Sequence, residues 1–217
     1  AFSPDEIPTL STINHAVCIL FHQGKMYCLD ATNRYLSLED IPEGIQGRKV
    51  LVENGTDCRI ETLPLPEEPS TTDSLYYRYE LSANGTTFAL KGTVSRQCNG
   101  MNKELLLNLY DSKSKEGQKD FLHTLLTERP HTCTVTDIRM EGNTPEVPYW
   151  RLTGTITNAT AVQSVDGELF IEPDPHDDFF DQPIDTTKRK QDYMLPYRCR
   201  NVREVSIGLP AKRTVSY

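Results

Sequence analysis

The stretch Leu75-Tyr-Tyr-Arg-Tyr-Glu-Leu-Ser-Ala-Asn-Gly-Thr-Thr-Phe-Ala-Leu-Lys-Gly-Thr-Val94 contains two alternating segments that meet at an Asn-Gly pair. Such a pair between alternating segments predicts a β-hairpin with a two-residue type I′ turn. The turn fixes the register, because the residues that flank it face each other. The expected pairs are Ala83 with Thr86, Leu81 with Phe88, and Tyr79 with Leu90.

This hairpin has one apolar and one polar face. The apolar face carries Leu75, Tyr77, Tyr79, Leu81, Phe88 and Leu90, and the polar face carries Arg78, Glu80, Ser82, Thr87 and Lys91. Antiparallel sheets with one face on a core and the other in water have this pattern. We therefore expect a mainly β chain that forms an antiparallel β-sandwich with one packed α-helix, with a β-barrel as the alternative.

Other parts of the chain carry further signals. We expect hairpins around residues 22–24, around Asn54-Gly55 and around Asp166-Gly167. The first would place Cys18 opposite Cys28, and the second would place Leu51 opposite Cys58. Residues 105–110 read as a short buried strand, residues 118–129 as the helix, and residues 202–209 as the last strand. We expect one domain over 1–217, with an N-terminal arm (1–13) and an irregular acidic, then basic, segment (172–198).

Composition limits the class of partner. The chain has 217 residues, a formal net charge of -8 and a pI near 5.2, which argue against nucleic-acid binding and suit a basic protein partner or simple solubility. No apolar run is long enough for a membrane span. The first residues lack the features of a signal peptide, so we expect that a signal peptide has been removed.

Cysteines and sequons favour secretion. Six cysteines allow fifteen pairings, and we expect all six to be oxidised: Cys18, Cys28, Cys58, Cys98, Cys133 and Cys199. Asn-x-Thr sequons occur at Asn54, Asn84 and Asn158. The first two lie at expected hairpin tips, where an acceptor would be exposed; alternatively, Asn-Gly-Thr serves the turn alone.

No catalytic motif is present. The sequence lacks a Gly-x-Ser-x-Gly elbow, a His-Glu-x-x-His pair, a glycine loop for phosphate and a Cys-x-x-Cys pair. The five histidines lie singly in the sequence, away from metal-ligand spacing. We therefore expect no enzyme, no cofactor and no metal, although a hydrolase triad assembled across the fold is an open alternative.

The most unusual local composition is an acidic segment with two phenylalanines, Glu172, Asp174, Asp177, Asp178, Phe179, Phe180 and Asp181. Its carboxylates suit a basic protein, with the phenylalanines as apolar anchors. A calcium site and a solvated loop are the alternatives. Tyr76 beside Arg78, on the outward face of the main hairpin, is a second candidate binding surface.

The residues from Phe121-Leu122 to Leu126, followed by Cys133-Thr-Val-Thr-Asp-Ile-Arg139, resemble the helix-to-strand join of secreted poxvirus chemokine-binding β-sandwiches. The resemblance covers about a tenth of the chain and contains no diagnostic motif. It implies a soluble decoy for basic host cytokines. No binding residue is carried over from it.

These patterns predict a secreted, disulfide-bonded glycoprotein that binds and sequesters a basic protein ligand, such as a cytokine or chemokine, and thereby modulates immunity. A lipocalin-like barrel that carries a small apolar ligand is the first alternative. The sequence lacks the Gly-x-Trp expected near the start of such a chain. A secreted hydrolase without a legible motif is the second alternative.

Overall fold

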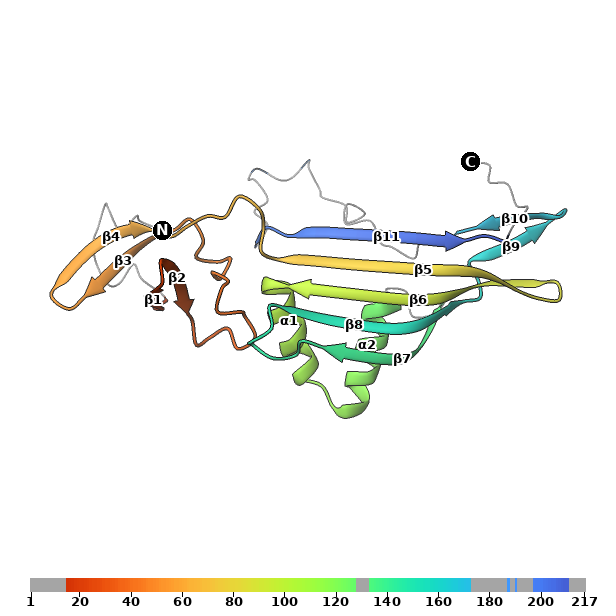
Figure 1. Cartoon of the computed structure of the whole chain (residues 1–217), viewed down its shortest axis with the longest axis horizontal. Helices are drawn as coiled ribbons and strands as arrows, with labels where there is room; N and C mark the ends of the chain where they lie inside the picture. The colour runs from red at the N-terminus through yellow and green to blue at the C-terminus, as the bar shows by residue number, and fades with distance from the viewer. Residues whose placement is uncertain (1–14, 128–132, 173–186, 188–189, 191–196, 211–217) are drawn as a thin grey trace.

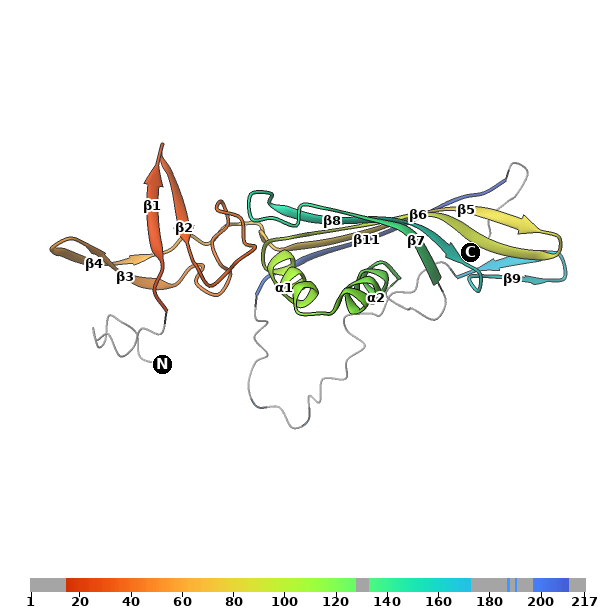
Figure 2. The same ribbon diagram turned by 90° about the horizontal axis from the view of Figure 1, so that it is seen from below.

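A computed structural model describes residues 15–127, 133–172, 187, 190 and 197–210. Its centre is one five-stranded sheet in the order β11-β5-β6-β8-β7. The strands are β5 (Thr72–Asn84), β6 (Thr87–Asn99), β7 (Cys133–Glu141), β8 (Tyr149–Asn158) and β11 (Arg200–Gly208). Two helices follow β6 in the sequence, α1 (Gly100–Asp111) and α2 (Lys115–Thr127), and both lie on the same side of the sheet (Figure 1, Figure 2).

Three separate hairpins extend the molecule at its ends. They are β1 (Cys18–His22) with β2 (Lys25–Leu29), β3 (Lys49–Asn54) with β4 (Asp57–Thr62), and β9 (Val162–Val165) with β10 (Glu168–Ile171). The first two lie at one end of the long axis and the third lies at the other (Figure 1). Only the central sheet is covered by helices, so it holds the main core.

The mainly β class is confirmed, but the sandwich is not. Among the described residues, helices form the second layer where a second large sheet was expected. The sheet is also mixed, because β11 runs parallel to β5 while the other pairs are antiparallel. It is open, with β7 and β11 as its edges, so it does not form the closed barrel of the alternative prediction.

The main hairpin exists, but its expected register is wrong by two residues. Ala83 faces Phe88 and Leu81 faces Leu90, and the loop is Gly85-Thr86. Gly85 has a φ of +62° whereas Thr86, the second loop residue, does not have a positive φ, which is the pattern of a type II′ turn with glycine first. A shift of two residues keeps every side chain on its expected face.

The same shift occurs in the β3–β4 hairpin, which also contains Asn-Gly-Thr. Leu51 faces Ile60, where Cys58 was expected, and the loop is Gly55-Thr56. The β9–β10 hairpin follows the expected geometry instead, because Asp166 and Gly167 both have positive φ, as a type I′ turn requires. The two hairpins in which threonine follows Asn-Gly thus have Gly-Thr loops, whereas the hairpin without this threonine has the expected type I′ turn.

In the β1–β2 hairpin the loop has two residues, where three were expected. Gln23 and Gly24 both have positive φ, and His22 pairs with Lys25. Cys18 therefore faces Leu29, while Cys28 faces Ile19. Because alternate residues of a strand point to opposite faces, Cys18 and Cys28 lie on opposite faces of the hairpin, and the expected facing pair is wrong.

Residues 105–110, expected to form a strand, belong to helix α1. The helix begins at Gly100, whose φ of +56° and close approach to Thr71 require glycine: a Cβ there would lie 2.7 Å from Thr71 Oγ1. Thr71 Oγ1 accepts a hydrogen bond of 3.0 Å from the Met101 amide and so caps the first turn. The expected helix is confirmed as α2, so the described residues form two helices where one was expected.

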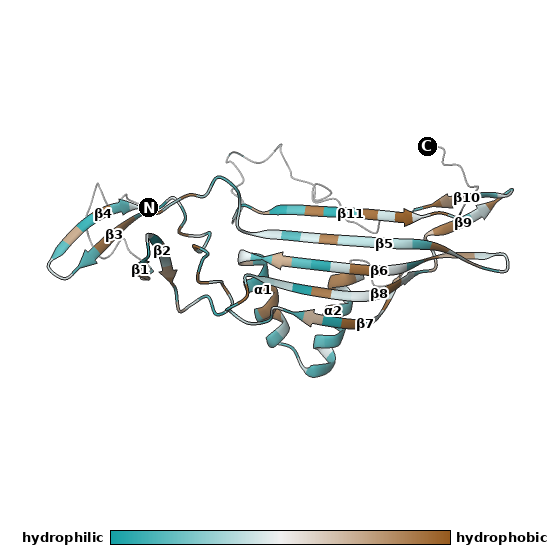
Figure 3. Cartoon of the chain, viewed as in Figure 1, coloured by the Kyte–Doolittle hydropathy of each residue, from teal (hydrophilic) through white to brown (hydrophobic). Residues whose placement is uncertain are grey.

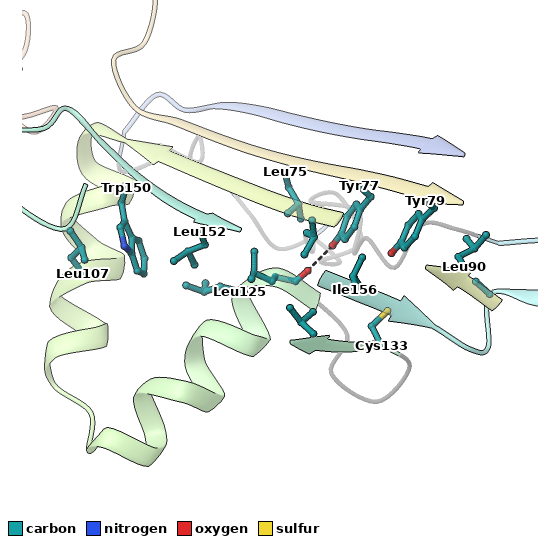
Figure 4. Packing of buried hydrophobic residues seen from close by; sticks show 14 of the residues in the cluster. Leu75, Tyr77, Tyr79, Leu90, Leu107, Leu125, Cys133, Trp150, Leu152 and Ile156 are labelled. Atoms are coloured by element: carbon teal, nitrogen blue, oxygen red, sulfur yellow. Dashed lines mark hydrogen bonds between the residues drawn. The ribbon is translucent and has the colours of Figure 1, made fainter. Parts of the chain in front are cut away.

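The core lies between the inner face of the sheet and the two helices (Figure 4). Trp150 is 1% exposed, as expected for a strand entry, and it lies near Leu107 of α1. Tyr77 donates a hydrogen bond of 3.2 Å to the Leu126 carbonyl of α2, and its ring stacks on that of Tyr79 at 5.7 Å. No helix or strand of the described residues covers the other face of the sheet.

Candidate functional site

The face of the central sheet opposite the helices is polar. Its side chains alternate along each strand with those of the core, as the hydropathy colouring shows (Figure 3). Strand pairing places Tyr76, Ser95, Thr153 and Arg139 in one row across the sheet. The next row consists of Arg78, Thr93, Thr155 and Thr136. These two rows thus combine hydroxyl groups, two guanidinium groups and one aromatic ring.

A groove of about 510 Å³ lies across these rows. Its lining comes from four strands, β5, β6, β7 and β8, and includes Tyr76, Arg78, Thr93, Thr153, Asp137 and Arg139. Tyr76 is half-buried, whereas both arginines are exposed. The groove is open to solvent along the sheet, so it suits a ligand that lies on the surface better than one that must be enclosed.

A β-bulge in β7 shapes one side of this groove. Thr136 pairs with Thr155 and Arg139 pairs with Thr153, so Asp137 and Ile138 together oppose Gly154. Asp137 has a φ of +53°, a strained conformation for a residue other than glycine. Gly154 is required here, since a Cβ would lie 2.6 Å from Val135 Cγ1. The bulge places both Asp137 and Arg139 at the groove.

The two groove arginines have no ionic partner in the part of the chain that the structure describes. Arg151, one row away on the same face, differs from them. Its Nε and Nη2 donate to Gln97 Oε1 at 3.1 and 2.7 Å, and its guanidinium lies 4.9 Å from the centre of the Tyr149 ring. Arg78 and Arg139 are therefore available to a ligand, while Arg151 is engaged by its neighbours.

A buried ionic cluster lies on the inner face. Arg96 donates to both carboxylate oxygens of Asp73, at 3.0 and 2.6 Å, and to the Leu125 carbonyl at 2.8 Å. Arg203 Nη2 lies 3.4 Å from the same carboxylate. Burial raises the pKa of Asp73, but the hydrogen bonds and charges of the two arginines outweigh it and hold the pKa below its ordinary value. This cluster joins β5, β6, β11 and the end of α2, and we interpret it as structural.

Charged residues of α1 attach the loop of residues 34–47 to the core. Buried Glu104 accepts hydrogen bonds from the Tyr35 amide and from Asn108, and Asp111 accepts one from the Tyr35 hydroxyl. Lys103, 1% exposed, donates to the carbonyls of Thr144 and Val147. Burial lowers the pKa of Lys103, and nearby acids, Asp40 first, oppose this shift. Hydrogen bonds to Glu104 and Asp111 thus fix Tyr35, at the start of the loop, while Lys103 fixes the segment before β8.

Asp40 in this loop predicts a pH dependence of stability. Burial raises its pKa from 3.8 to about 6, with Lys103 opposing and Glu39 and Glu43 adding to the shift. Between these two pKa values the folded chain binds more protons than the unfolded chain, so the free energy of unfolding falls as pH rises from about 4 to 6. In Asp40→Asn this decrease in the free energy of unfolding should be smaller by up to about 2 kcal/mol, a value that allows for the partial exposure of Asp40. Urea unfolding of both proteins at pH 4.5 and 7 measures it, and parallel pH profiles would contradict it.

The structure places some of the predicted binding residues. Tyr76 and Arg78 line the groove. Glu172 lies elsewhere: it is exposed after β10, and its amide donates to the Ala161 carbonyl at 2.8 Å. The other members of the acidic segment lie outside the described residues: Asp174, Asp177, Asp178, Phe179, Phe180 and Asp181. The structure therefore brings together only the Tyr76–Arg78 pair of the predicted surfaces.

Sequence reasoning did not identify Arg139 or the hydroxyl residues Thr93, Ser95, Thr153 and Thr155 as groove residues. A signal was available in Thr153-Gly-Thr-Ile-Thr157, where threonines recur at every second position and so share one face of a strand. The position of Arg139 required knowledge of the bulge. No pattern in the sequence indicates this bulge, in which two residues of β7 oppose one residue of β8.

Residues 15–127, 133–172, 187, 190 and 197–210 hold no cluster of three or more metal-binding side chains and no helix that could span a membrane. His15 lies 2.8 Å from Asp30, and His123 Nε2 accepts from the Val135 amide at 3.3 Å. All six cysteines are described residues, and no disulfide bond joins any two of them. The expected disulfides are therefore not confirmed.

Comparisons with known proteins give no relative for this chain. No protein-family model, no curated protein and no solved structure matches it.

Proposed function

We propose that this chain is a secreted, non-catalytic glycoprotein that binds and sequesters a protein ligand, with the outer groove as its contact surface. One observation carries the proposal: both helices cover the same face of the sheet, and the opposite face holds a groove lined by Tyr76 and by two arginines that have no ionic partner among the described residues. Tyrosine and arginine are the residue types that protein interfaces enrich, because each adds a large contact area and a polar group.

The resemblance to poxvirus chemokine-binding proteins supports a decoy role, with a cytokine or chemokine as the ligand. The acidic segment at residues 172–181 is the second proposed contact surface, and it suits a basic ligand. Oxidised cysteines stay a prediction, which thiol titration of the unfolded, unreduced protein tests.

Two of the three sequons have suitable positions for glycans. Asn54 and Asn84 are exposed at the ends of hairpin strands. Asn158 is 4% exposed, and its Oδ1 accepts three hydrogen bonds, from the Thr160 amide, the Thr160 hydroxyl and the Ala161 amide. A glycan on a side-chain amide needs solvent around it. We therefore propose Asn54 and Asn84 as the occupied sites.

The test begins with a pull-down from secretions that contain candidate ligands, with mass spectrometry of the bound material. The association of each captured protein is then measured for three variants. We expect Tyr76→Ala with Arg78→Gln to weaken binding at least about tenfold, the size of effect typical of hot-spot residues. Lys91→Gln, on the same face outside the groove, should leave the affinity within about twofold.

The third variant replaces Asp174, Asp177, Asp178 and Asp181 by asparagine. It distinguishes the two proposed surfaces, because loss of acidic charge should slow association and flatten its salt dependence. Full binding by the Tyr76–Arg78 variant, with loss only in the acidic variant, would contradict the groove as the contact surface.

A further inference from the structure

We infer that the groove accepts an extended acidic segment of the protein partner, with two carboxylates four residues apart that bind Arg78 and Arg139. The inference rests on the proposed function and specifies the chemistry of the partner at that site. This part of the partner would be acidic, whereas the acidic segment of the chain itself, residues 172–181, suits a basic ligand.

The spacing of the arginines sets the spacing of the carboxylates. Arg78 is on β5 and Arg139 is on β7, with β6 and β8 between them. Three strand separations of about 4.8 Å put the two strands roughly 14 Å apart, and Arg78 lies one row, or two residues of about 3.4 Å, further along the sheet than Arg139, so their Cα atoms are roughly 16 Å apart. Residues i and i+4 of an extended peptide are roughly 14 Å apart and point to the same side, and the long arginine side chains can span the remaining difference. A segment that crosses the strands would therefore present two such carboxylates together.

The chemistry of the groove matches this segment. A guanidinium group binds a carboxylate through two parallel hydrogen bonds, and neither groove arginine has an ionic partner among the described residues. The hydroxyls of Thr93, Ser95 and Thr155 lie between them and can donate to or accept from a peptide backbone. Tyr76 adds an aromatic surface beside them.

Nearby acids favour isolated carboxylates over a dense polyanion. Asp137 lines the groove, and Glu204 of β11 is the neighbour of Tyr76 in the same row. Glu80 and Glu141 lie on the same face in the flanking rows. A sulfated glycan, with charges along its whole length, would meet repulsion at these positions. A peptide with two separated carboxylates can avoid them.

The test uses two synthetic peptides of the same composition, both acetylated and amidated. In Ser-Glu-Ser-Thr-Ser-Glu-Ser the glutamates are four residues apart, and in Ser-Ser-Glu-Glu-Thr-Ser-Ser they are adjacent. Each is titrated at low salt into the isotope-labelled full chain, and amide chemical shifts report binding. We expect the spaced peptide to bind more tightly, with shifts confined to β5, β6, β7 and β8.

The variants Arg78→Gln and Arg139→Gln should each weaken the spaced peptide about tenfold, the loss of one charge-assisted pair, while Lys91→Gln should not. Equal binding of both peptides, or binding that neither arginine affects, would overturn the inference. The absence of peptide binding would also overturn the inference. The same holds if a heparin-derived tetrasaccharide binds through Arg78 and Arg139 and the peptides do not bind. If a captured protein partner depends on Tyr76 but not on Arg78 and Arg139 together, the inference fails while the proposed function stands.

Discussion

Leu90→Ala should lower the free energy of unfolding by about 2–5 kcal/mol, whereas Phe88→Ala should lower it by clearly less. Leu90 is 0% exposed and faces Leu81, while Phe88 is half-buried and faces Ala83 close to the turn of the hairpin. The register expected from Asn-Gly would have paired Leu81 with Phe88 and given Phe88 the larger effect. Urea unfolding of the two variants therefore measures the register as well as the core.

Lys91→Ala provides the control for this pair, because Lys91 follows Leu90 in the same strand and is exposed on the outer face. We expect it to cost under about 0.5 kcal/mol. A larger loss for Phe88→Ala than for Leu90→Ala would show that the turn lies at Asn84-Gly85 after all.

Arg96→Met should cost about 3 kcal/mol, because it leaves the buried Asp73 carboxylate with the more distant Arg203 and the weak thiol donor of Cys98. The side chains of Arg96 and Asp73 are 12% and 8% exposed, so water cannot replace the lost partner. The double variant Arg96→Met with Asp73→Leu should be more stable than Arg96→Met alone, since it removes the stranded charge. Denaturant unfolding of the single and double variants measures this coupling, and additive losses would contradict it.

The same cluster has a pH signature of the opposite sign to that of Asp40. The pKa of Asp73 is lowered in the folded chain, so its stabilising contribution is present above the unfolded value of 3.8 and is lost as pH falls below it. Without Arg96, burial would raise this pKa instead. The stability deficit of Arg96→Met should therefore be largest near neutral pH and should shrink on acidification.

The faces of the strands could be predicted from the sequence, but their register could not. Alternation in residues 75–94 reports only whether a side chain points inward or outward, and a two-residue slip preserves this parity. The choice between Asn-Gly and Gly-Thr as loop residues depends on a small difference between turn types, because glycine in first position satisfies type II′. Asp166-Gly167 has Glu168 after it in place of threonine, and there the expected turn is confirmed.

Helix α1 was missed because its buried side is not its apolar side. The buried positions are Gly100, Lys103, Glu104 and Leu107, which have helical spacing but only one large apolar member. Leu105 and Leu109, which suggested a buried strand, are 48% and 42% exposed. Lys103 and Glu104 are buried because loops far away in the sequence supply their hydrogen-bond partners. A local pattern carries no information about such partners.

Part of the groove, Tyr76 and Arg78, could be predicted from the sequence. Tyr76 and Arg78 could be placed on the outward face because the hairpin itself defines that face. Arg139 could not be placed beside them, since that required the order of strands in the sheet and the bulge of β7. Strand order is set by packing over the whole chain, and it is the least local property of a sheet.

The parallel pairing of β11 with β5 has a consequence for synthesis of the chain. Arg200 pairs with Thr72 and Gly208 with Glu80, so strand β5 can acquire its outer neighbour only after residues 200–208 have left the ribosome. Until then β5 presents an unpaired edge along the nine residues 72–80, a template for pairing with other nascent chains. Truncation before residue 200 should therefore yield a product that aggregates during expression, even though most of the core residues are present.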